Sequence, residues 1–197
     1  MSYKNPTVPT FTGLKGLELR IQNLQTYLAA NITWLEYFFG LADRLTRQAG
    51  EDTVIFPATW LENKTDPFDC LPSDVYNFCF WTADDVSEVS YSDEFAVRKD
   101  NLVTQEVSLI IFVNLKDISS TVSFNVTRSA CRNELMNVLN SVMGIDAVFV
   151  AKEYIENDIE EIYSEFSFEA IENNKKELPF WAIRVNGELS FRPDCNA

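Results

Sequence analysis

The segment 102–115, Leu-Val-Thr-Gln-Glu-Val-Ser-Leu-Ile-Ile-Phe-Val-Asn-Leu, places the tightest limit on what this chain can fold into. Successive side chains of a strand point to opposite faces. Here one face carries Val107, Leu109, Ile111 and Val113, and the other carries Ile110, Phe112 and Asn114. A strand that is apolar on both faces lies near the centre of a covered sheet. We therefore expect the chain to fold around a sheet that other segments cover.

Two amphipathic helices are expected to supply that cover. In residues 14–31 the apolar positions recur at steps of three and four, which puts Leu14, Leu17, Ile21, Leu24 and Leu28 on one stripe. Thr12 is the expected N-cap of this helix. In residues 125–143 a second stripe is formed by Cys131, Leu135, Val138, Leu139 and Val142. Gly144 is the expected residue after its last turn.

Runs of β-favouring residues predict further strands in the first half of the chain. One covers residues 32–40, and residues 41–47 after it are compatible with a turn, a solvated continuation or a helix. Another covers residues 53–60. Pro57 within it has no backbone N–H, so we expect an edge strand or a bulge there. A short strand is also predicted over residues 76–81.

The C-terminal third is less regular in its pattern. Residues 145–163 are mixed and predict a short helix around 151–161, whereas residues 166–171 alternate like a strand. Residues 180–191 close the chain as β structure. Within them, Asn186-Gly187 fits a type I′ hairpin turn between two five-residue arms, and fits equally a bulge in one long strand.

Together these patterns predict an α/β (α+β) fold. It consists of a mostly antiparallel or mixed β-sheet packed by two amphipathic helices, with a long acidic and aromatic loop insertion. Residues 1–13, which contain prolines and little pattern, are expected to form an extended N-terminal arm. Residues 14–192 form a single domain with interaction loops at 61–101, and residues 193–197 form a C-terminal tail.

The charge balance limits the partners. The chain has 197 residues, with 30 acidic and 16 basic side chains, and a formal net charge of −14. This excess repels phosphate backbones and anionic lipid headgroups, and it favours a basic partner or a complementary neighbouring subunit. No apolar run approaches the roughly 18 residues of a membrane helix, and the first residues lack the apolar core of a signal peptide. We expect no specific nucleic-acid binding, no membrane contact and no secretion by a signal peptide.

The residue types that carry chemistry are sparse. The chain has no histidine, the usual proton shuttle and commonest metal ligand. Its four cysteines lack zinc spacing and are expected to be reduced and partly buried. The acidic groups lack the spacing of a calcium-binding loop, and no phosphate-binding glycine motif is present. We therefore predict no catalytic residue, no metal site and no cofactor.

The aromatic and acidic side chains of residues 60–95 are the better candidates for a functional surface, because loops this long in a compact domain commonly carry interactions. If exposed, the aromatics would be anchors of an interface; the alternative is that they fill the core between the sheet and the loops. The predicted subunit-interface residues are Trp60, Phe68, Asp69, Tyr76, Trp81, Asp84, Asp85 and Tyr91.

The order of these elements carries a resemblance. An amphipathic helix is followed by Trp-x-x-Tyr at residues 34–37, a proline-containing strand ending in Trp60, and an acidic segment with Leu71-Pro-Ser-Asp74. Then come an aromatic strand, a long central strand ending at Asn114, a second amphipathic helix, and the segment Trp-Ala-Ile-Arg-Val-x-Gly-x-Leu-Ser-Phe-Arg at residues 181–192. Over most of residues 14–192 the chain resembles the tail-terminator and head-to-tail connector proteins of tailed bacteriophages.

The resemblance implies a ring-forming structural protein of the virion neck or tail, without catalytic activity. It would assemble in the host cytoplasm as a homo-oligomeric ring. Its partners would be neighbouring connector or tail proteins, with DNA passing through the ring. It also implies an α/β sheet packed by helices, in which the C-terminal strand is long and bulged rather than a hairpin.

Two other functions stay open on the residues alone. An acidic DNA-mimic inhibitor, or another soluble interaction protein, fits the charge, although a mimic needs carboxylates spaced along an elongated face. A hydrolase based on two carboxylates would need a close, buried acidic pair in a deep pocket.

Overall fold

The computed structural model describes residues 6–49, 52–61, 66–72, 74, 76–91, 101–141, 147–156, 158–167 and 177–192, with backbone alone for 49, 84–91 and 101. The helices are α1 (Gly16–Asn31), α2 (Leu115–Ile118), α3 (Phe124–Asn140) and α4 (Ile159–Ile162). The strands are β1 (Tyr37–Leu41), β2 (Asp43–Ala49), β3 (Asp52–Thr59), β4 (Phe68–Asp69), β5 (Phe78–Tyr91), β6 (Asn101–Asn114), β7 (Ala147–Glu156) and β8 (Phe180–Phe191).

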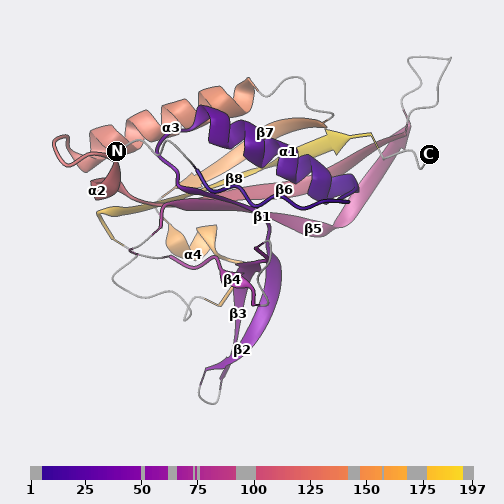
Figure 1. The fold of residues 1–197 in the computed structure, drawn as a ribbon, viewed down its shortest axis with the longest axis horizontal. Coiled ribbons are helices and arrows are strands. Elements are labelled where there is room, and N and C mark those ends of the chain that lie inside the picture. Colours follow the sequence, from indigo (N-terminus) through magenta and orange to yellow (C-terminus); the bar gives the residue numbers. More distant parts are fainter. Residues whose placement is uncertain are drawn as a thin grey trace.

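A five-stranded sheet in the order β1-β5-β6-β8-β7 forms the body of the protein (Figure 1). β1 runs parallel to β5, and the other pairs are antiparallel. β6 lies at the centre, with Leu109 paired to Trp81 of β5 on one side and to Val185 of β8 on the other. The predicted central strand and the mixed α+β fold class are confirmed.

Both predicted amphipathic helices pack on the same face of this sheet (Figure 1). Ile21, Leu24 and Leu28 of α1 and Leu135 of α3 are buried there against Val107, Leu109, Ile111 and Val113 of β6. On the opposite face Ile110 and Phe112 join a cluster rich in aromatics that includes Phe78, Phe80, Ile159 and Ile162. The alternation read in β6 thus separates two apolar clusters, as the sequence predicts.

The start of α1 differs from the prediction. The helix begins at Gly16, with Lys15 in the N-cap position and no side-chain cap, so Thr12 is not the N-cap. Gly13 and Gly16 have φ values of +78° and +58°, which only glycine adopts readily, and the chain turns into the helix there. Before this turn Thr7 pairs with the β1 edge, where Phe38 N donates to Thr7 O at 2.9 Å.

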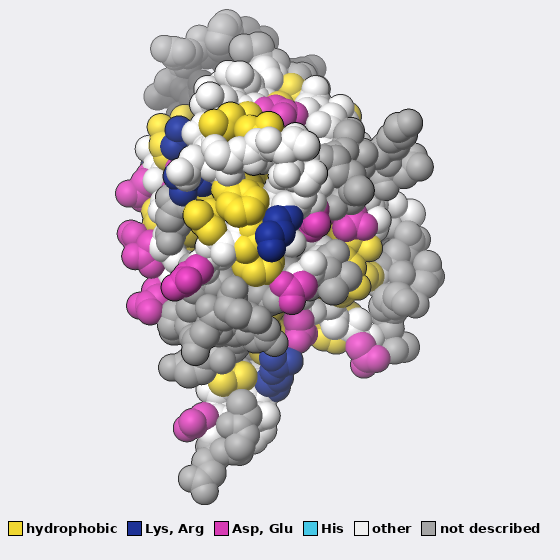
Figure 2. Space-filling model, turned by 90° about the vertical axis from the view of Figure 1, so that its left-hand side faces the viewer, with side chains coloured by type: hydrophobic (Ala, Val, Ile, Leu, Met, Phe, Trp, Pro, Cys, Tyr) yellow, Lys and Arg dark blue, Asp and Glu magenta, His cyan; other side chains and the backbone are white. Residues whose placement is uncertain are grey.

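A second, smaller sheet in the order β2-β3-β4 projects from the body. In both views the β2–β3 hairpin, which we call the arm, extends away from the main sheet (Figures 1 and 2). Residues 43–49 are therefore a strand rather than a turn or helix. Pro57 lies in the middle strand of this sheet, not at an edge. The Pro57 carbonyl accepts a hydrogen bond from Cys70 N at 2.8 Å. Because proline has no backbone N–H, it cannot donate a second bond to this segment, and the pairing of β3 with β4 ends at this point.

Two predictions based on local composition are wrong. Within segment 61–101, which is expected to be loop apart from a short strand at 76–81, Phe68–Asp69 forms β4 and the fourteen residues Phe78–Tyr91 form β5. Antiparallel pairing is made by backbone groups, so an acidic segment continues as a strand when its partner, β6, favours β structure strongly. Residues 151–156 belong to β7 rather than to a helix, and only Ile159–Ile162 is helical.

The alternative of one long C-terminal strand is correct, because β8 runs without a turn through Asn186 and Gly187. The irregularity lies in its neighbour instead: the β7–β8 register shifts between Ala151 and Glu153. The strand predicted at 166–171 is not seen at Phe166 and Ser167, which are outside any strand, and its other residues lie outside the described residues. Gly144, the expected residue after the last turn of α3, and the tail 193–197 also lie outside the described residues.

Candidate functional site

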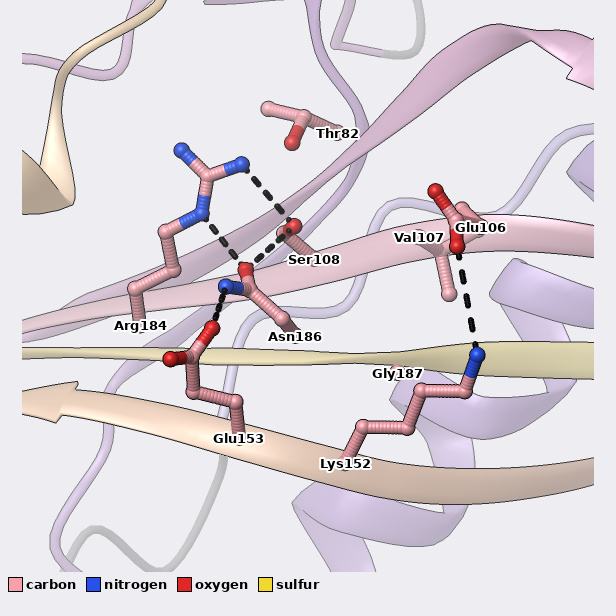
Figure 3. A pocket seen from close by; sticks show the side chains of 9 residues that line it. All are labelled: Thr82, Glu106, Val107, Ser108, Lys152, Glu153, Arg184, Asn186 and Gly187. Atoms are coloured by element: carbon pink, nitrogen blue, oxygen red, sulfur yellow. Dashed lines mark hydrogen bonds and ion pairs between the residues drawn. The ribbon is translucent and has the colours of Figure 1, made fainter.

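The β7 irregularity builds a polar pocket of about 300 Å³ on the sheet, which we call the Arg184 pocket (Figure 3). Ala151 pairs with Gly187 and Glu153 pairs with Asn186, so Lys152 is the extra residue of a bulge. Lys152 and Glu153 consequently extend to the same side, toward β8 and β6 (Figure 3). Thr82 and Ser108, from β5 and β6, complete the lining.

Arg184 is the most heavily bonded side chain of this pocket, and it is only 11% exposed. Its Nε donates to Asn186 Oδ1 at 2.7 Å, and its Nη2 donates to Ser108 Oγ at 3.0 Å. It also forms an ion pair with Glu165 and reaches the Ile162 carbonyl at 3.4 Å. Arg184 therefore ties β8 to β6 and to the segment around α4, and most of its donors are used within the chain.

Asn186 occupies the centre of the network (Figure 3). Its Oδ1 accepts from Ser108 Oγ at 2.8 Å as well as from Arg184, and its Nδ2 donates to Glu153 Oε2 at 3.1 Å. Ser108 therefore directs its proton at an amide oxygen, which is no general base, so the arrangement does not activate it as a nucleophile. The network instead joins side chains of β6, β7 and β8.

The described cysteines offer no nucleophile either. Cys70, Cys79 and Cys131 are buried free thiols. Burial raises the pKa of Cys70 and Cys79, and it raises the pKa of Cys131 to about 12 with Glu134 adding to the effect. Thiols that stay protonated near neutral pH are unreactive. Within the described ranges, no group of three or more His, Cys, Asp or Glu side chains could hold a metal ion.

A second pocket, of about 250 Å³, lies between α1, β1 and the base of the arm, and we call it the Trp60 pocket. Trp60 directly follows β3, is 46% exposed, and donates from Nε1 to Asp43 Oδ2 at 3.0 Å. Glu18 and Gln22 of α1 line the same pocket, together with Phe11 from the N-terminal segment. Of the eight predicted interface residues, Trp60 lines the Trp60 pocket, and none is among the residues that line the Arg184 pocket.

The structure separates the other predicted residues. Phe68 and Tyr76 are half-buried and contact each other at a ring-centroid distance of 5.6 Å. Asp69 forms an ion pair with Arg47 at 2.8 Å on the arm. The prediction is wrong for Trp81, which is fully buried and packs edge-on to Phe149, because its strand lies inside the sheet.

The last three candidates, Asp84, Asp85 and Tyr91, lie on β5, and their side chains fall outside the described residues. The eight residues consequently do not form one surface, since they divide between the arm, the aromatic cluster and the main sheet.

Sequence reasoning missed Arg184 and Asn186, and it missed Asp43 as the partner of Trp60. The dipeptide Asn186-Gly187 is typical of a turn, so the sequence did not indicate that Asn186 belongs to a hydrogen-bond network on a strand. Asp43 lies 17 residues before Trp60, and the two meet because β2 and β3 pair with Asp43 opposite Ala58. Identification of residues 43–49 as a strand would have brought them together.

In comparisons with known proteins, no protein-family model and no curated protein matches this chain. No helix within the described parts of the chain has the length and apolar character needed to cross a membrane.

Proposed function

We propose that this protein is a non-catalytic structural subunit that assembles as a ring in the neck or tail of a tailed bacteriophage, joining neighbouring rings around the DNA channel. The observation that carries the proposal is the arm, which projects from a body with an apolar cluster on each face of its sheet (Figure 1). The virion, assembled in the host cytoplasm, would be its location.

The arm has features of a segment that packs on another chain. The described side chains of β2 are mostly exposed, and Ile55 of β3 is 39% exposed. The arm is fixed to the body through Arg44, which pairs with Glu165 at 2.6 Å, and through Ser167, which bonds the Ile55 backbone at 2.7 and 2.8 Å. Because isolated hairpins have little stability of their own in water, a projecting hairpin gains from a neighbour's surface.

The architecture supports the same proposal. The family resemblance implies a helix-packed sheet with one long C-terminal strand, and β8 is continuous over twelve residues. The chain's charge of −14 would keep passing DNA from adhering to a ring of such subunits, because like charges repel.

Electron microscopy of negatively stained protein at high concentration, with sedimentation velocity, tests the proposal. Closed rings are expected for the wild type. Ile55→Asp should abolish them without lowering the melting temperature, because it places a charge on the exposed side of the arm. Val126→Asp is the matched control, since Val126 is exposed at 58% on α3, away from the arm. A monomer at every concentration, alone and with its neighbouring tail proteins, would contradict ring formation.

A further inference from the structure

We propose that the Trp60 pocket binds the guanidinium group of an arginine side chain presented by a partner protein. This inference goes beyond ring formation, because it assigns a ligand chemistry to one pocket and does not require the partner to be a second copy.

The charge of the pocket selects a cation. Two carboxylates, from Glu18 of α1 and Asp43 of β2, are among its lining residues, and no Lys or Arg is among the residues described around it. Glu18 is exposed, and Asp43 is exposed with its carboxylate held by the Trp60 indole N–H. The chain as a whole carries a formal net charge of −14, so its long-range electrostatic field also attracts a cation.

The aromatic side chain favours a planar cation. All four tryptophans of the chain lie in the described residues, and Trp34, Trp81 and Trp181 are at most 3% exposed, whereas Trp60 is 46% exposed. Its bond to Asp43 fixes the ring beside a carboxylate. The face of an indole attracts cations, and the flat guanidinium group of arginine stacks on it while forming a bond to a neighbouring carboxylate.

The remaining walls suit the rest of an arginine side chain. Pro9, Leu14 and Leu41 provide apolar surface for the methylene groups. Thr59, which also lines the pocket, is 2% exposed, and its hydroxyl has no hydrogen-bond partner in the described structure. A buried hydroxyl without a partner is costly, and a guanidinium N–H could supply the missing donor.

The pocket is formed in advance by a bond that fixes its outer wall. Phe11 N donates to Gln22 Oε1 at 2.6 Å, and Gln22 Nε2 returns a bond to Phe11 O at 3.3 Å. This pair of bonds holds the N-terminal segment against α1. A wall that is ordered before binding reduces the entropic cost of taking up a ligand.

Trp60 itself provides the assay. Because the other three tryptophans are buried, acrylamide quenching of the intrinsic fluorescence reports mainly on Trp60. We would titrate the full chain with the peptide acetyl-Gly-Arg-Gly-amide and follow protection from the quencher. Protection should saturate in about the millimolar range, typical of a single side chain. The same peptide with citrulline, which is neutral and has nearly the same shape, should give no protection.

Charge variants separate the pocket from general attraction. Asp43→Asn keeps an acceptor for the indole and should weaken binding by about three- to tenfold. Asp52→Asn removes an equal charge from the exposed start of β3, outside the pocket lining, and should leave binding unchanged. Melting temperatures of both variants are measured alongside, so that a loss through unfolding is recognised.

Three results would overturn the inference. Equal protection by the citrulline peptide would show that charge is not recognised. Equal weakening by Asp43→Asn and Asp52→Asn would show that the attraction is not local. Binding of n-butylguanidine, a guanidinium on a bare carbon chain, several-fold more tightly than the peptide would assign the pocket to a free small molecule instead of a partner protein. A failure to form rings would leave each of these readouts unaffected.

Discussion

Replacing Gly187 with alanine tests the packing of β8 against β7. Gly187 pairs with Val107 on β6 and with Ala151 on β7. A Cβ at this position would lie 2.5 Å from the Val150 carbonyl oxygen and 2.6 and 2.7 Å from two ring atoms of Phe149. Since non-bonded carbon contacts are most favourable at about 3.5–4.0 Å, both neighbours would have to withdraw by about 1 Å.

Neither neighbour is free to withdraw. The Val150 carbonyl belongs to the backbone of β7, which pairs with β8 along nearly its whole length. The Phe149 ring is 6% exposed and packs edge-on to Trp81 at a centroid distance of 5.4 Å. Overpacking lowers the free energy of unfolding by about 1–3 kcal/mol. Because neither neighbour can move freely, we expect a loss of about 2–3 kcal/mol for Gly187→Ala. For a chain of this size the melting temperature should fall by about 4–12 °C.

Equilibrium unfolding in urea measures this loss, and Gly40→Ala is the matched control. Gly40 also lies in a strand, but a Cβ there would meet only Gln25 Nε2, at an ordinary 3.7 Å. The control should change the free energy of unfolding by less than about 0.5 kcal/mol. If the two variants were equally stable, the close approach of β7 to Gly187 would be refuted.

Three further changes test other parts of the structure. Arg184→Met should lower the free energy of unfolding by roughly 2–3 kcal/mol in urea titrations, because it removes the centre of a nearly buried network. In a Cys195→Ser variant the remaining thiols should not react with Ellman's reagent at pH 8 until the protein unfolds, since the pKa of Cys131 is raised to about 12; prompt labelling would contradict their burial. Partial burial, and then repulsion from Asp117, raise the pKa of Glu36 above its ordinary 4.5, so the folded state holds this proton more tightly than the unfolded state and loses stability as pH rises through that range. Glu36→Gln should therefore stabilise the protein by roughly a few tenths of a kcal/mol at pH 7, as thermal unfolding would show, and the gain should vanish in acid.

The parts of the fold that sequence predicts are those in which one segment carries its own pattern. β6 is apolar on both faces, and α1 shows a clear helical period, so each could be assigned before its neighbours were known. In contrast, β5 continues as a strand through an acidic segment only because β6 lies beside it. The helix predicted in residues 151–156 fails for the same reason, since pairing with β8 outweighs the local preference for helix.

The candidate sites depend even more on long-range pairing. Trp60 could be chosen from its residue type, but the carboxylate that holds its ring lies across the β2–β3 hairpin. Arg184 could not be singled out, because its acceptors come from β6, from its own strand and from the segment after α4. A sequence shows which side chains are chemically capable, and the strand register decides which of them meet.

One inserted residue in β7 accounts for several of these differences at once. The bulge at Lys152 brings Lys152 and Glu153 to the same side of the strand, where they reach Glu188 and Asn186 respectively. Directly before the bulge, the β7 backbone and the Phe149 ring approach Gly187 too closely to leave space for a Cβ. Asn186 and Gly187 are therefore needed for a hydrogen-bond network and a close backbone approach, although together they have the composition of a turn. Residue type alone does not distinguish a type I′ turn from this arrangement, and the long-range pairing of β8 with both β6 and β7 favours the continuous strand.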